Sequence, residues 1–110
     1  MASKEGLVGL VVYENLTYRS STRNFFYLII KETPRSVILR RMDSIQRTDD
    51  GQRGTEVPSP KNNPIYDDPR YYIRARKHEP DEPSGRICFS YKRHAFFLWD
   101  SKPLIFDYMD

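Results

Sequence analysis

One β-hairpin constrains the fold more than any other feature of the sequence. Residues 25–31 (Phe-Phe-Tyr-Leu-Ile-Ile-Lys) are aromatic and β-branched, and they are apolar on both alternating faces, which is typical of a central strand. Residues 32–35 (Glu-Thr-Pro-Arg) interrupt this run as a turn, and residues 36–42 (Ser-Val-Ile-Leu-Arg-Arg-Met) resume it. The two runs therefore predict a β-hairpin.

Other short runs with strand character lie on both sides of this hairpin, and no window has a helical period of useful length. They are residues 7–13, 70–77, 86–93, 95–99 and 104–108. Turn residues separate them, and a short helix within residues 90–98 is the main local alternative. We therefore expect a mainly β protein, a small barrel or strongly bent antiparallel sheet of SH3-like size with five to seven short strands.

The length of 110 residues fits one domain, residues 1–110, and leaves no room for a second core. Aromatic residues make up 14% of the chain, and their large rings can fill that core. Residues 43–69 contain four of the eight prolines and almost no apolar residues. This composition predicts a long, exposed and mobile loop, with at most a short strand near residues 53–57.

The second predicted hairpin has two chemically different faces. Residues 70–77 and 86–93 alternate at period two, so pairing through the turn at 78–85 directs Tyr71, Ile73 and Ala75 toward the core. The opposite face, extended by the end of the first hairpin, then carries cations around one ring. Its residues are Arg40, Arg41, Tyr72, Arg74, Arg76, Arg86 and Lys92.

The distribution of charge follows the predicted strands. The net charge of +3 divides into +4 for residues 1–42, −3 for 43–69, +4 for 70–94 and −2 for 95–110. Clustered cations on a curved sheet displace counterions from phosphates, and an exposed ring stacks on bases. The clustered cations expected on the second hairpin therefore predict a non-enzymatic, nucleic-acid-binding accessory protein. The alternative is an ordinary solvated face, neutralised by acidic loops at 43–69 and 79–82.

A protein partner is the second hypothesis. The chain would then be an inhibitor or adaptor that binds a host protein through loop 43–69 or through an exposed strand edge, which can pair with another chain. A homodimer through the same strand edge remains an alternative.

One pattern has the lettering of a metal-dependent nuclease site. It combines residues 80–81 (Pro-Asp) with residues 100–102 (Asp-Ser-Lys), and such sites need carboxylates and a lysine that converge on a divalent cation. Here the first part lies in an acidic turn and the second resembles a β-turn. We therefore do not expect nuclease activity.

The remaining candidate groups do not predict an enzyme, a metal site or a cofactor either. The pairs Asp49-Asp50 and Asp67-Asp68 lie in loops marked by proline or glycine, and neither His78 nor His94 has a second ligand at metal spacing. Cys88 alternates to the polar face, which leaves a reactive thiol open, but no activating histidine accompanies it.

We expect an intracellular protein that does not enter a membrane. The single cysteine excludes an intramolecular disulfide, and the first residues lack the basic start and apolar run of a signal peptide. The longest apolar run, residues 25–30, is too short to span a bilayer.

Two segments resemble a family of small uncharacterised proteins of phages and mobile elements. Residues 22–42 contain its Thr-x-Asn, aromatic-Tyr and Ser-Val-x-x-Arg elements, and residues 98–103 (Leu-Trp-Asp-Ser-Lys-Pro) resemble its Leu-Trp-Asp-Gly-Lys-Pro. Two positions depart from the family pattern. Ser101 stands where glycine is usual, and Pro34-Arg35 differs from the residues that the family has in the turn. The resemblance implies a viral or mobile-element origin and a packing role for Trp99, and it carries no known activity.

Overall fold

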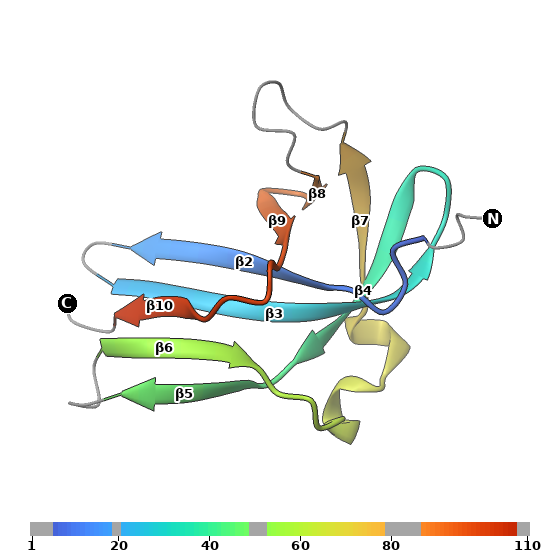
Figure 1. Cartoon of the computed structure of the whole chain (residues 1–110). Coiled ribbons are helices and arrows are strands. Elements are labelled where there is room, and N and C mark those ends of the chain that lie inside the picture. The colour runs from blue at the N-terminus through green and yellow to red at the C-terminus, as the bar shows by residue number, and fades with distance from the viewer. Residues whose placement is uncertain (1–5, 19–20, 49–52, 79–86, 108–110) are drawn as a thin grey trace.

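Six antiparallel strands close a small barrel in the computed structural model, which describes residues 6–18, 21–48, 53–78 and 87–107 (Figure 1). Around the barrel the order is β2-β9-β8-β7-β4-β3, and β3 pairs with β2 to close it. The predicted mainly β class and small barrel are confirmed. The barrel strands are β2 (Val11–Tyr18), β3 (Ser21–Glu32), β4 (Ser36–Met42), β7 (Ile73–His78), β8 (Cys88–Tyr91) and β9 (His94–Leu98).

Three further strands, β5 (Ser44–Thr48), β6 (Arg53–Pro58) and β10 (Leu104–Asp107), extend the sheet beyond the barrel. Strand β3 is long enough for β4 and β10 to share one of its edges, with β10 pairing at Thr22. From there the order continues β10-β6-β5. The segment 43–69 is therefore not the long loop expected, and the short strand expected near 53–57 is confirmed as β6.

The central hairpin is confirmed, with one irregularity that matters for the surface. Strands β3 and β4 pair antiparallel, but the register shifts between Ile29, which faces Leu39, and Lys31, which faces Ile38. One extra residue in β3 reverses the direction of every side chain that follows it. Lys31 therefore lies on the outer face of the barrel and Glu32 on the inner face.

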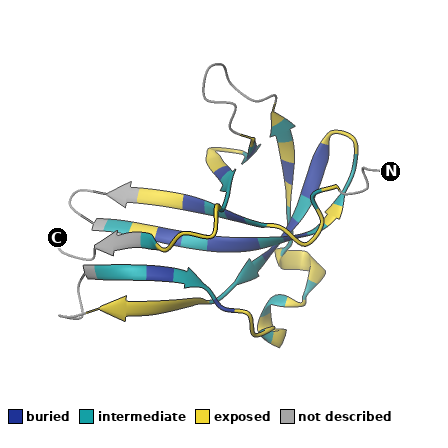
Figure 2. Ribbon diagram, viewed as in Figure 1, coloured by how far each residue is buried: buried dark blue, intermediate teal, exposed yellow. Residues whose placement is uncertain are grey.

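The core consists of inward-facing residues from all six barrel strands (Figure 2). Side chains alternate across each strand, so every second residue enters the barrel. Rings contribute much of the filling, and Tyr27 and Phe96 meet edge to face with their centroids 5.2 Å apart. The buried set is Val12, Tyr27, Ile29, Val37, Leu39, Ala75, Phe89 and Phe96.

An ion pair and the segment before β2 cover one end of the barrel. Lys77 Nζ lies 2.5 Å from Glu32 Oε2, and the backbone N–H of Leu7 donates to Glu32 Oε1 at 2.8 Å. The side chain of Leu7 packs against the core. Gly9, at a φ of 96°, lets the chain turn there and donate to the Ile29 carbonyl.

The outward face of β3 has its own apolar contact. Phe26 is fully buried, and the ring of Trp99 meets it edge to face with the centroids 6.0 Å apart. Trp99 Nε1 donates to the backbone carbonyl of Lys102 at 2.7 Å, which fixes the indole. Trp99 therefore packs against the outer face of β3 and does not belong to the barrel core that the resemblance implied for it.

Two short 3-10 turns, η1 (Pro64–Tyr66) and η2 (Pro69–Tyr71), precede β7. The turn η2 takes up the start of the run expected as a strand. Tyr71 is therefore 66% exposed, and the prediction that it enters the core is wrong. Strand β9 likewise replaces the alternative helix within 90–98. No helix in the described part of the chain is long and apolar enough to cross a membrane.

Candidate nucleic-acid interface

Cations from two barrel strands meet on the outer face of the barrel. The register aligns Ile38 of β4 with Lys31 on one side and with Arg74 of β7 on the other. All three therefore point outward, and both cations are exposed. Lys31 was not among the predicted site residues, because only the bulge in β3 turns it to this face.

The next row along the strands adds two more cations. Arg76 lies between Ser36 of β4 and Ser90 of β8, and the Arg35 carbonyl accepts the backbone N–H of Lys77, which places the β3–β4 turn beside β7. Arg35 and Arg76 are exposed. We call Lys31, Arg35, Arg74 and Arg76 the basic face.

No carboxylate among the described residues forms an ion pair with any member of the basic face. Arg74 donates to Ser36 Oγ at 3.1 Å, a neutral partner that orients the guanidinium without cancelling its charge. Glu32, which neighbours Lys31 in sequence, instead pairs with Lys77 at the barrel end. Among the described residues, then, no carboxylate neutralises the face, and the acidic loop 79–82 lies outside the part of the chain that the structure describes.

The contacts of Glu32 also perturb its titration. The hydrogen bond from Lys77, followed by that from the Leu7 backbone, lowers the pKa of the Glu32 carboxyl below its ordinary value. Glu32 is thus held as an anion on the inner face while the cations near it in sequence remain outside.

Arg40 does not belong to this face, contrary to the prediction. Arg40 is only 8% exposed. Its Nε lies 2.7 Å from Asp67 Oδ1, and its Nη2 donates a hydrogen bond to the Asn63 carbonyl at 3.0 Å. These contacts hold the η1–η2 segment against β4. Arg40 is a structural residue.

Arg41 does not lie on the basic face either, contrary to the prediction. It shares the inner face of β4 with Leu39, and its guanidinium carbon lies 4.6 Å from the ring centroid of Phe25 and 6.0 Å from that of Tyr66. Cation–π contacts of this kind stabilise an enclosed arginine. Arg41 therefore lines the opposite end of the barrel from Glu32.

The structure places the remaining predicted residues in different surroundings. Tyr72 is half-buried and its hydroxyl donates to the Asp67 carbonyl at 3.3 Å, so it is not the free stacking ring expected. Lys92 is exposed in the β8–β9 turn, with Nζ 5.3 Å from the centroid of Tyr91. Arg86 lies outside the described residues. Only Arg74 and Arg76 stand as predicted at the centre of the face.

The residues considered for catalysis that the structure describes are not assembled into a site, and Asp49 and Asp50 lie outside the described ranges. Asp100 Oδ1 accepts the backbone N–H of Lys102, as in the β-turn expected, and residue 81 lies outside the described part of the chain. His94 contacts the buried carboxylate of Glu14 on the neighbouring strand β2, and Cys88 is half-buried. Within the described ranges no three potential metal-ligating side chains gather.

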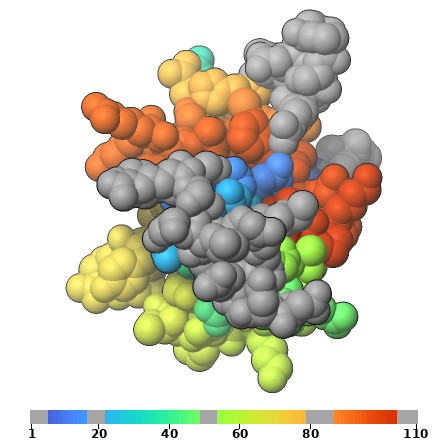
Figure 3. Space-filling view, turned by 90° about the vertical axis from the view of Figure 1, so that its left-hand side faces the viewer, coloured from blue at the N-terminus to red at the C-terminus, as the bar shows by residue number. Residues whose placement is uncertain are grey.

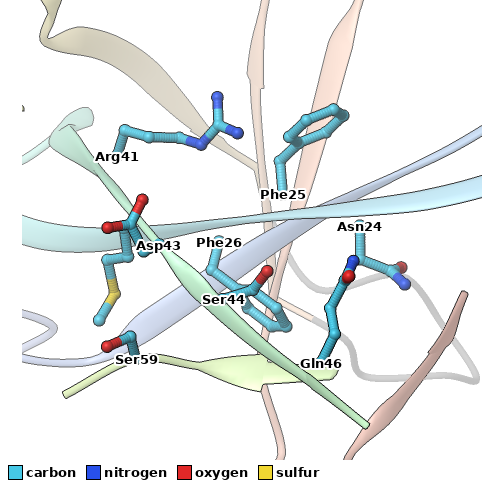
Figure 4. Close-up of a pocket in the computed structure, with 9 residues that line it drawn as sticks. Asn24, Phe25, Phe26, Arg41, Asp43, Ser44, Gln46 and Ser59 are labelled. Atoms are coloured by element: carbon cyan, nitrogen blue, oxygen red, sulfur yellow. The ribbon is translucent and has the colours of Figure 1, made fainter. Parts of the chain in front are cut away.

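A polar cavity of about 530 Å³ lies at the fork where the chain leaves β4 and enters β5 (Figure 4). Asn24 and Gln46 lie on one side of it and Arg41 on another. Both carboxylate oxygens of Asp43 already accept hydrogen bonds, one from Asn63 Nδ2 and one from the Tyr66 hydroxyl, each at 2.8 Å. These bonds lower the pKa of Asp43, and they fix η1 to the barrel without offering a reactive group.

No family model matches the chain, and neither curated proteins nor solved structures show a significant similarity to it.

Proposed function

We propose that this chain is a non-enzymatic binding protein, an accessory protein of a virus or mobile element, that contacts nucleic acid through the basic face. One observation carries the proposal: four exposed cations gather on β3, on β7 and in the β3–β4 turn, and none is paired with a described carboxylate. Unpaired, clustered cations on a rigid sheet suit the phosphate backbone, because binding releases its condensed counterions.

The chemistry of the face favours phosphates over bases. Lysine and arginine supply charge, and arginine adds a planar fork of donors that matches phosphate oxygens. Tyr72, the ring expected to stack on bases, is half-buried and hydrogen-bonded. We therefore expect binding that tolerates changes of base sequence and depends strongly on salt.

The test is the affinity for fluorescent single-stranded DNA, duplex DNA and RNA, measured by anisotropy across a salt series. Four phosphate contacts predict a slope of log affinity against log salt of roughly −3 for single strands and −4 for duplex DNA. A slope near zero would refute the proposal.

A charge-reversed pair provides the matched comparison. Arg74→Glu with Arg76→Glu should abolish binding, because it places two anions at the centre of the basic face. Lys61→Glu with Lys102→Glu makes the same change in net charge at exposed positions outside this face and should retain most of the affinity. Equal losses in both variants would mean that only overall charge matters, and would contradict a defined interface.

A protein partner bound at a strand edge is the second candidate, because β5 ends the strand order of the described sheet. Such a partner would tolerate the reversals at Arg74 and Arg76 and would respond to substitutions in β5.

A further inference from the structure

Arg41 is a half-buried cation without a paired counter-charge. Its Nε–H is enclosed and has no hydrogen-bond acceptor, and no described carboxylate forms an ion pair with its guanidinium. An enclosed donor without an acceptor and an enclosed charge without a partner each cost free energy. The guanidinium of Arg41 therefore has capacity for an acceptor that the chain itself does not supply.

The groups that surround this guanidinium are neutral rings. Its carbon lies 4.6 Å from the ring centroid of Phe25, 5.9 Å from that of Tyr27 and 6.0 Å from that of Tyr66. Burial raises the pKa of Tyr27, and a hydrogen bond to Asp43 raises the pKa of Tyr66, so both phenols are uncharged at neutral pH. The π faces stabilise the cation but supply no formal negative charge.

Arg41 also lines the cavity at the fork between β4 and β5. In the view of Figure 4 its side chain lies between those of Asp43 and Phe25, while Ser44 and Ser59 contribute further polar lining. The volume of about 530 Å³ is within the range of small-molecule pockets. A charged fork, hydroxyl groups and one ring are the features that orient a small polar ligand in such pockets.

Asp43 limits how much negative charge this cavity accepts. The hydrogen bonds from Asn63 and Tyr66 lower the pKa of its carboxyl, which is therefore an anion at neutral pH. A fixed anion beside the guanidinium repels a chain of phosphates more than it repels a ligand with one acidic group.

We propose that this cavity binds a small molecule through a single oxyanion group, a carboxylate or a phosphate monoester, held by the guanidinium of Arg41. The planar fork of an arginine side chain matches two oxygens of either group. Such a ligand supplies both the acceptor and the counter-charge that Arg41 lacks.

This site is separate from the basic face. Arg41 lines the end of the barrel opposite Glu32, whereas Lys31 of the basic face is the neighbour of Glu32 in β3. Strands β7 to β9 lie in one half of the molecule and β5 and β6 in the other, as both the ribbon and the space-filling view show (Figures 1 and 3). The two sites can therefore be tested independently.

Three probes that share a phenyl ring test the proposal: benzoate, phenyl phosphate and the uncharged benzamide. Each is titrated into the parent chain while two-dimensional NMR follows the Nε–H of Arg41 and the backbone amides of Asp43 and Ser44. We expect at least one of the two anions to bind with a Kd of about 1 mM or tighter, and benzamide to bind at least about tenfold more weakly. The tighter of the two anions distinguishes a carboxylate ligand from a phosphate ligand.

Matched arginine variants locate the site. Arg41→Gln should weaken anion binding at least about tenfold, and Arg41→Lys should also weaken it because an ammonium lacks the planar fork. Arg47→Gln makes the same change in net charge as Arg41→Gln at an exposed position of β5 that does not line this cavity, and it should keep the parent Kd. Circular dichroism checks folding, and Arg41→Lys decides if Arg41→Gln does not fold.

Four results would overturn the proposal. They are no binding of either anion up to about 10 mM, equal binding of benzamide, parent affinity in the folded Arg41 variants, and an equal loss in Arg47→Gln. The chain with Arg74→Glu and Arg76→Glu should bind the anions as the parent does, and a loss there would place them on the basic face instead. A failure at Arg41 leaves the affinity for nucleic acid untouched, because that affinity is tested with the basic-face variants.

Discussion

Arg40 and Arg76 both occupy the outer faces of barrel strands, yet their surroundings give them opposite roles. Arg40 is almost fully enclosed by its contacts with Asp67 and the Asn63 carbonyl, whereas Arg76 is exposed and pairs with no described carboxylate. Removing a charged donor from an enclosed network costs more than removing one from solvent.

We therefore expect Arg40→Gln and Arg76→Gln to separate stability from binding. The first should lower the free energy of unfolding by about 1–2 kcal/mol and leave nucleic-acid affinity unchanged. The second should change stability by less than about 0.5 kcal/mol and weaken binding. Urea unfolding and anisotropy on the same two proteins measure both effects, and a loss of binding only in Arg40→Gln would reverse our assignment of the basic face.

At this scale the sequence predicted the direction of some side chains, but not of Arg41 or Tyr71, and not what covers them. Alternation correctly placed Arg74 and Arg76 outside. It could not show that a segment more than twenty residues further along the chain encloses Arg40, nor that a bulge turns Lys31 outward. Both effects depend on tertiary pairing, which no local pattern encodes.

Among the elements, predictability follows apolar content. The β3–β4 hairpin was evident because its strands are apolar and its turn is marked by proline. Strand β5 has one apolar residue, Ile45, and all its side chains are exposed. Its strand conformation depends on the ladder with β6, a tertiary pairing that its own composition did not indicate.

The β5–β6 hairpin depends on a glycine that permits close approach. A Cβ at Gly54 would lie 1.9 Å from the Arg47 carbonyl oxygen, which is part of the facing backbone. We expect Gly54→Ala to push β5 from β6 at a cost of about 1–3 kcal/mol and to accelerate amide exchange in both strands. Gly9→Ala is the comparison: it strains a positive φ outside this hairpin, so exchange in β5 should match the parent chain. Unchanged exchange in Gly54→Ala would contradict the close approach.

At the scale of the whole molecule, closure of the barrel brings together parts of the chain that no sequence window connects. Glu32 of β3 receives the Lys77 ammonium from β7 and the Leu7 N–H from the segment before β2. The sequence predicted the barrel because strands were numerous and short. It did not predict this polar closure, because its members lie 25 and 45 residues apart.

This closure makes stability depend on acidity with a definite sign. The Lys77 hydrogen bond lowers the pKa of Glu32 from its ordinary value of 4.5, so the folded chain binds a proton there less readily than the unfolded chain. The stabilisation is complete above that value and is lost as pH falls through the lower folded pKa.

We expect Glu32→Gln to unfold with a shallower dependence on pH between about 5 and 3 than the parent chain, measured by urea unfolding at each pH. Lys77→Gln should flatten the profile in the same way, because it removes the donor that lowers this pKa. Profiles parallel to that of the parent chain in both variants would show that the pair contributes nothing to acid sensitivity. Two carboxyls would then be left to examine: Asp43, whose pKa is lowered by Asn63 and Tyr66, and Asp68, whose pKa is lowered by Arg70.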